Sequence, residues 1–126
     1  MLMDTQSRHP VFETPDMAYQ TMARERPVDL VRLARQTGGD RALEEEVLHL
    51  FLKQAKSIGK AMRVGTDADQ RKRHAHTLKG AAHAVGAGAI ADTAKAVEDS
   101  PGERRCVRAL LTEIDRTCDY INSLLR

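Results

Sequence analysis

The chain has few aromatic residues, no tryptophan and no long apolar run. Aromatic residues make up only 3% of its 126 residues, so the core has to be assembled from Leu, Val, Ile, Ala and Met, a set that suits close helix packing better than sheets. A stretch of about 18 apolar residues is missing, and residues 1–10 lack the basic-then-apolar order of a signal peptide. We therefore expect an all-α, cytoplasmic protein without a membrane partner.

The charge pattern indicates no nucleic acid partner, and the cysteine spacing indicates no disulfide. Lys and Arg number 20 against 18 Asp and Glu, which gives a net charge of +2, and the basic residues are scattered between acidic ones. A nucleic acid attracts clustered positive charge, so we expect no nucleic acid partner. Cys106 and Cys118 lie on one predicted helix, about 18 Å apart along its axis and beyond the reach of a disulfide. We expect two free thiols.

Helix start and stop signals divide the chain, whose length is about that of one domain. We predict a flexible leader over residues 1–13 and a single helical domain over residues 14–126. The first helix is expected over residues 14–24, where a threonine, a proline and an aspartate open it. A second short helix is expected over residues 28–36 and is ended by two glycines.

Four longer helices are predicted over residues 40–64, 67–85, 88–98 and 101–125. In the first of them, apolar residues recur at three- and four-residue intervals, namely Leu43, Val47, Leu50, Phe51, Ile58, Ala61 and Met62. The last is opened by Ser100-Pro101-Gly102-Glu103, which has the order of a capping box. Short connections force antiparallel neighbours. The predicted fold is an antiparallel up-down four-helix bundle with one or two short extra N-terminal helices.

The predicted helix over residues 67–85 has a polar stripe opposite its apolar one. At about 100° per residue, one face collects His76, Lys79, Gly80 and His83. The opposite face collects Leu78, Ala81, Ala82 and Val85. The imidazole of His76 therefore faces water.

Two neighbours make His76 a candidate for chemistry. Lys79, one turn on, places an ammonium where it can neutralise a phosphoryl group attached to the imidazole. Gly80 costs the helix about 1 kcal/mol relative to alanine, which indicates that something approaches closely there. Easier helix packing is the alternative explanation for Gly80, but this glycine falls on the solvent side.

Other chemistries of an exposed histidine fit the sequence poorly. His74 and His76 diverge by about 200°, and His83 stands about 10 Å from His76 along the helix axis, too far for one metal ion without other ligands. No Gly-x-Ser-x-Gly turn accompanies the histidine, which disfavours a hydrolase. A glycine-rich phosphate loop is also missing, so we expect no bound ATP and no metal.

Further residues extend the pattern on both sides of the histidine. Upstream are Val28-Asp29-Leu30, Gly38-Gly39-Asp40 and the apolar run to Phe51, and downstream are Val85-Gly86-Ala87, Ala91, Ala94 and Glu98. Together with His76-Thr77-Leu78-Lys79-Gly80-Ala81-Ala82, they resemble the histidine-containing phosphotransfer (HPt) domain of bacterial-type phosphorelays. The resemblance covers about residues 27–125.

The resemblance implies a phosphorelay intermediate. In this role His76 accepts a phosphoryl group from the aspartyl-phosphate of one receiver domain and passes it to another, Lys79 is the charge partner of that group, and Gly80 leaves room for the partner's active site. The implied partners are response-regulator receiver domains and a hybrid sensor histidine kinase. The receiver supplies the magnesium, so no cofactor is expected on this chain.

Such a transfer needs positioning and charge neutralisation more than many catalytic groups. We therefore expect a phosphoryl carrier and not an enzyme. An unperturbed imidazole, with a pKa of about 6.5, is largely neutral at cytoplasmic pH and already nucleophilic. Because members of this family are generally monomeric, the resemblance also implies a monomer.

Lys72, Arg73 and His83 are candidates for contacts with the partner. The two basic residues flank the acceptor and can steer an acidic receiver surface, and His83 shares the stripe of His76. The simpler explanations are a solvated basic face and an ordinary surface histidine. His74 points toward the core side, where we expect a structural histidine.

Two other functions stay open at this point. One is the phosphoacceptor domain of a histidine kinase, phosphorylated in trans from ATP. The start-like Met1 and a chain end directly after the last predicted helix instead favour the expectation of a complete chain. A kinase dimerisation domain is disfavoured because Thr77 stands where an acidic residue is expected. The other is a scaffolding helical bundle whose histidine is incidental.

Overall fold

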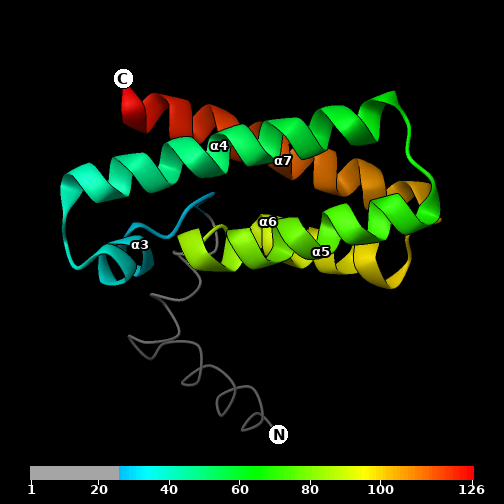
Figure 1. The fold of residues 1–126 in the computed structure, drawn as a ribbon, viewed down its shortest axis with the longest axis horizontal. Helices are drawn as coiled ribbons and strands as arrows, with labels where there is room; N and C mark the ends of the chain where they lie inside the picture. The colour runs from blue at the N-terminus through cyan, green and yellow to red at the C-terminus, as the bar shows by residue number, and fades with distance from the viewer. Residues whose placement is uncertain (1–25) are drawn as a thin grey trace, which may run out of the picture.

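The structure is a computed structural model that describes residues 26–126, and these residues form five α-helices and no strand. The helices are α3 (Leu30–Thr37), α4 (Arg41–Val64), α5 (Ala68–Val85), α6 (Gly88–Asp99) and α7 (Arg104–Leu125). Figure 1 shows α4 to α7 lying alongside one another, with α3 at one end. The all-α prediction is confirmed for this range. The predicted leader over residues 1–13 and the predicted helix over residues 14–24 lie outside the described residues.

Aspartate side chains begin three of the helices. Asp29 and Asp40 accept hydrogen bonds from backbone N–H groups in the first turns of α3 and α4. Asp67 and Gln70 form a capping box at the start of α5. A carboxylate at this position satisfies free N–H groups and complements the helix dipole. The predicted starts at Asp40 and Asp67 are confirmed, whereas the helix expected from Val28 begins two residues later, after its cap.

The predicted capping box at Ser100 is wrong. α7 begins at Arg104, and its N-cap residue Glu103 makes no side-chain cap hydrogen bond. Ser100 instead follows the end of α6, and the Glu103 N–H donates to the Ser100 carbonyl at 3.0 Å across a turn. Proline suits the second position of a turn as well as the first position of a helix. The sequence of these four residues alone therefore does not distinguish a helix cap from a turn.

An aliphatic core lies between the helices. α4 packs against α5 and α7, α6 packs against the same two helices, and α3 contacts α4 and α5. The largest fully buried side chains include Leu33, Leu78, Ile90, Leu110, Ile114 and Ile121. α5 and α6 also bury small side chains, namely Ala75, Ala82, Ala91 and Ala94. Because alanine adds little bulk, the axes of α5 and α6 can approach closely.

α4 carries two apolar stripes, of which one is buried. The predicted stripe included Leu43 and Leu50, but these side chains are 40% and 62% exposed. The buried stripe contains Leu48, Phe51, Leu52, Ala55, Ile58, Gly59 and Met62. Both stripes repeat at three- and four-residue intervals, so periodicity does not distinguish them. The predicted amphipathic helix is confirmed, and the apolar residues named from the sequence include members of both stripes.

A close backbone contact ties α3 to the end of α5. The Asp29 N–H donates to the Gly86 carbonyl at 2.8 Å, and Arg32 Nε donates to the His83 carbonyl at 3.1 Å. Gly86 has a φ of +79°, and a Cβ added there would lie 3.0 Å from the Asp29 carbonyl oxygen. Both the left-handed backbone and the close approach of Asp29 require glycine.

Replacing this glycine tests the α3 to α5 contact. We expect Gly86→Ala to lower the free energy of unfolding by about 2 kcal/mol, because the substitution strains the backbone and pushes against Asp29. Urea denaturation followed by circular dichroism measures the change. Gly80→Ala is the matched control, since a Cβ there meets no atom within 4 Å, and we expect it to raise stability by up to about 1 kcal/mol. Equal stabilities of the two variants would contradict the contact.

Candidate functional site

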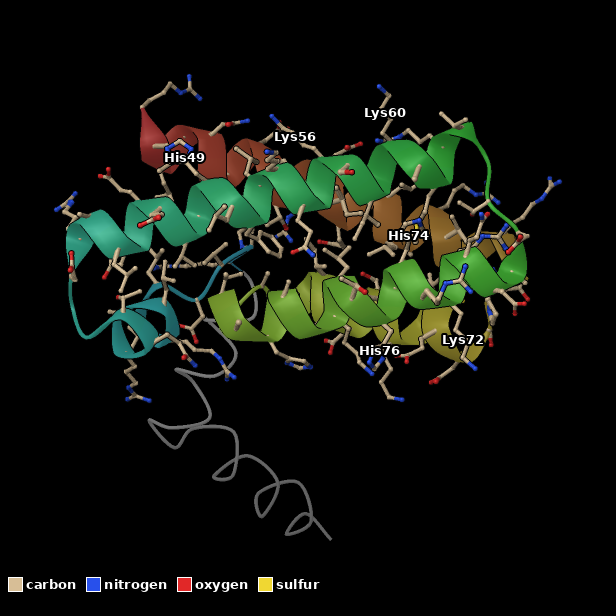
Figure 2. All side chains as sticks on the ribbon, viewed as in Figure 1. His49, Lys56, Lys60, Lys72, His74 and His76 are labelled. Atoms are coloured by element: carbon tan, nitrogen blue, oxygen red, sulfur yellow. The ribbon has the colours of Figure 1, made fainter. Side chains whose placement is uncertain are left out.

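His76 lies on the exposed face of α5, and its side chain is 69% exposed. Figure 2 shows it on the side of α5 that faces away from α4, whereas His74 lies on the side toward α4. Lys79 follows one turn later and is more covered, with 26% of its side chain exposed. The imidazole therefore faces water, as the helical phase predicts.

Glu98, near the end of α6, bridges both residues. Its Oε2 lies 2.6 Å from His76 Nδ1, and its Oε1 accepts a hydrogen bond from Lys79 Nζ at 2.7 Å. The Glu98 side chain is only 17% exposed. Hydrogen bonds from Lys79 and then His76 hold the pKa of this carboxyl below its usual value. The bridging group is therefore a charged carboxylate at neutral pH.

The carboxylate decides which ring nitrogen of His76 carries the proton. In a neutral imidazole one nitrogen donates and the other accepts. Since Glu98 accepts at Nδ1, the proton lies there, and the lone pair is on Nε2. The free, nucleophilic nitrogen of His76 is therefore Nε2.

Glu98 belongs to the sequence pattern that resembles the family, but the sequence alone predicts no role for it. The residue reaches His76 because the chain reverses at Gly86, which adopts a left-handed conformation with φ +79°. His76 precedes that turn by ten residues and Glu98 follows it by twelve, so the two lie nearly level on adjacent helices. This near symmetry about a helix-ending glycine is the signal that could have identified Glu98.

Gly80 leaves open space beside the imidazole. A Cβ added there would meet no atom within 4 Å among the described residues. Packing against a neighbouring helix therefore does not explain this glycine. Because Gly80 has no side chain, no atoms project from the helix next to His76, and another molecule can approach the helix backbone there.

The remaining predicted site residues lie at the surface around His76. Lys72, Arg73 and His83 are all exposed, and Figure 2 shows Lys72 on the same side of α5 as His76. Within residues 26–126, none of these three side chains makes a hydrogen bond or an ion pair. His74 is half-buried, which fits a boundary histidine.

A groove runs between α4 and α5, on the side of α5 where His74 lies. One part has a volume of about 550 Å³ and is lined by Leu50, Lys53, Gln54, Ser57, Ile58, His74 and Thr77. The next part, of about 410 Å³, shares Ser57 and His74 and adds Lys60 and Val64. His74 and Thr77 line the groove and His76 does not, so the groove lies around the helix from the histidine. Its walls combine exposed apolar side chains with lysines.

Neither a metal-ligand cluster nor a membrane-spanning helix occurs among the described residues. No three His, Cys, Asp or Glu side chains between residues 26 and 126 are placed to hold a metal ion. None of the helices in this range has the length and apolar character needed to cross a membrane. The predicted free thiols are confirmed for Cys106 and Cys118, and burial raises the pKa of the Cys118 thiol.

Comparison with known proteins identifies one family. The chain matches the family model described as the Hpt domain over residues 45–122. This range contains most of α4, all of α5 and α6 and most of α7, and it includes His76, Lys79, Gly80 and Glu98. No curated protein and no solved structure matches the chain.

The tautomer of His76 tests the Glu98 bridge. We expect the neutral imidazole to carry its proton on Nδ1 in the natural chain and to lose this preference in Glu98→Ala, which removes the acceptor. Long-range ¹H–¹⁵N correlation spectra of the ring, recorded at about pH 8 where histidine is neutral, measure the tautomer. Glu98→Gln keeps a carbonyl acceptor and should retain the preference. An unchanged tautomer in Glu98→Ala would show that the carboxylate does not orient the ring.

Proposed function

Since the chain belongs to the Hpt domain family, whose members are phosphocarrier modules that act with receiver domains in two-component systems, we propose that it is a phosphorelay intermediate. His76 accepts a phosphoryl group from the aspartyl-phosphate of one receiver domain and passes it to another response regulator. The donor receiver belongs to a hybrid sensor histidine kinase. The observation that carries the proposal is the exposed His76 whose Nδ1 contacts a covered carboxylate at 2.6 Å.

The transfer needs little from this chain beyond the imidazole. Nε2 of His76 attacks the phosphorus, a nitrogen–phosphorus bond forms, and the aspartate leaves as a carboxylate. No proton has to leave Nε2, because Glu98 holds the ring proton at Nδ1, where the carboxylate also stabilises the positive charge that develops on the ring. In the second step an aspartate of the next receiver attacks the phosphorus and the nitrogen–phosphorus bond breaks. The receiver supplies the magnesium, which neutralises phosphoryl charge.

Lys79 and Gly80 complete the acceptor. Lys79 Nζ is bound to Glu98 at 2.7 Å, on the same face of α5 as His76, and serves as a charge partner for the phosphoryl group. The open space over Gly80 admits the edge of the receiver's active site. The reactive nitrogen of His76, the positive charge of Lys79 and the open space over Gly80 thus lie within about one turn of α5.

The receiver docks over α5 and α4. Lys72, Arg73 and His83 surround the acceptor on α5, and the groove beyond Thr77 adds Leu50, which is 62% exposed, and Lys53. On the other side of His76, α6 exposes Asp92 and Asp99. A receiver surface that carries the acidic magnesium pocket is attracted by the lysines of α4 and less by α6, whose Lys95 is paired with Asp99 at 3.0 Å. Exposed apolar surface on the α4 side adds to the binding energy.

We also propose the finer architecture and the extent of the domain. The short connections between α4, α5, α6 and α7 and their pairwise packing support an antiparallel up-down four-helix bundle. Because α3 packs on α4 and α5, the domain extends beyond the matched residues 45–122 toward the N-terminus. Its proposed range is residues 14–126.

Phosphoryl transfer from isolated receivers tests the function. We expect phosphorylated receiver domains to label the natural chain with an acid-labile, base-stable phosphoryl group, and His76→Gln to abolish the label because it removes the nucleophile. Autoradiography after acid and base treatment measures both properties. His83→Gln, on the same stripe, is the control and should still be labelled. Label retained by His76→Gln would contradict the assignment, and no label from any receiver would favour a scaffold.

Rates of phosphoryl transfer measured at varied receiver concentration test whether the receiver docks on the α4 side of His76. We expect the double variant Leu50→Ala/Lys53→Glu to raise the half-saturating receiver concentration by about tenfold, since it removes apolar area and reverses a charge in the contact. The transfer rate at saturation should stay unchanged because the acceptor is intact. Lys95→Glu, a charge reversal on α6, is the matched control and should have little effect. The opposite pattern, with transfer sensitive only to Lys95→Glu, would place the receiver over α6.

A further inference from the structure

A further cavity lies where α4 ends and α7 begins, and Figure 1 shows these two helix ends on the right. Its volume is about 430 Å³, and its lining comes from α4, the α4–α5 connection, α5, the α6–α7 connection and α7. Arg71, Arg104 and Arg108 line it, and Met62 and Val107 give it an apolar part. No carboxylate lines the cavity. His76, Lys79, Gly80 and Glu98 do not line it, although the second part of the α4–α5 groove shares Gly65 and Thr66 with it.

Arg71 is a half-buried cation held by neutral groups. Its guanidinium donates to Thr66 Oγ1 at 3.2 Å and to the backbone carbonyls of Thr66 and Pro101. These contacts orient the guanidinium but leave its charge uncompensated, because no carboxylate within residues 26–126 pairs with it. A guanidinium has five N–H donors, so Arg71 retains donors for a further acceptor. The cavity therefore contains an oriented positive charge without a counter-ion.

Arg104 and Arg108 bring two more positive charges to the same space. They are one turn apart on α7, where like charges repel each other. Arg104 also lies in the first turn of α7, which contains no acidic residue, so its charge opposes the helix dipole. Neither arginine forms an ion pair with another residue that the structure describes. Three unfavourable arrangements of positive charge thus meet in one cavity, and a bound anion would reverse each of them.

We propose that this cavity binds an organic phosphate that carries at least two negative charges. Guanidinium groups donate paired N–H bonds whose geometry matches phosphate oxygens. The volume lies in the range of small-molecule sites and exceeds the need of inorganic phosphate alone. Met62 and Val107 offer contact to the apolar part of such a ligand. The ligand is bound and not hydrolysed, because the lining contains no acidic residue to hold a magnesium ion.

Isothermal titration calorimetry of the full chain tests the proposal with ADP, pyrophosphate and inorganic phosphate at about 0.15 M ionic strength. We expect ADP to bind more tightly than pyrophosphate, and both to bind more tightly than inorganic phosphate. Arg104→Gln/Arg108→Gln should weaken ADP binding by about tenfold or more, because it removes two charge-assisted contacts. The matched control is Arg105→Gln, which removes the same charge from an exposed residue that does not line the cavity; it should change affinity less than twofold by comparison.

Amide ¹H–¹⁵N spectra locate the ligand. Shifts on adding ADP should concentrate at Gly65 and Gly102, both of which line the cavity, and His76→Gln should leave ADP binding intact, because the two sites are separate. The proposal is overturned if the natural chain binds neither ADP nor pyrophosphate, if Arg105→Gln weakens binding as much as the double variant, or if the shifts centre on His76. Sedimentation with phosphatidylcholine vesicles that contain phosphatidylglycerol, whose phosphate carries one negative charge, tests the attraction to an anionic lipid surface. Binding to these vesicles without binding of ADP or pyrophosphate would also overturn the proposal.

Discussion

The carboxylate of Glu98 is the interaction on which the candidate site depends, because it connects the reactive face of α5 to a second helix. One oxygen lies 2.6 Å from His76 Nδ1, and the other accepts from Lys79 Nζ at 2.7 Å. These distances require α5 and α6 to lie close together, which their buried alanines permit. Gly86 lets the chain reverse between the two helices. The geometry of an exposed histidine thus rests on small residues that are buried or in a turn.

Exposure differs between the candidate nucleophile and the carboxylate that positions it. The His76 side chain is 69% exposed, whereas that of Glu98 is 17% exposed. A nucleophile that reacts with another protein has to be reachable, but a hydrogen bond that orients a ring is stronger where water competes less. The helix pair meets both needs because the imidazole projects from α5 and the carboxylate approaches from the side. This arrangement suits a carrier, which has to present a nucleophile to another protein.

Local sequence signals predicted much of the fold. They failed where the same residue pattern is compatible with two different local structures. Asp40 and Asp67 open helices as expected, because a capping bond involves only neighbouring residues. Ser100-Pro101-Gly102-Glu103 forms a turn instead of a cap, since the same residue types serve both. The apolar residues of α4 form a buried and an exposed stripe, and Leu50 belongs to the exposed one. The spacing of apolar residues predicts both stripes, but it does not show where the neighbouring helices lie and therefore which stripe is buried.

The sequence by itself determined most of the helix positions and the outward direction of His76, because each follows from residues near one another in the chain. It also carried the resemblance to the Hpt domain, whose most specific part is the motif around His76. Only the tertiary structure decided that Glu98 meets His76, that the groove beside Thr77 exposes Leu50, and that Arg71 shares a cavity with Arg104 and Arg108. These contacts join segments far apart in the sequence. They depend on how closely helices approach and where turns reverse the chain, which is set by side-chain volumes throughout the core.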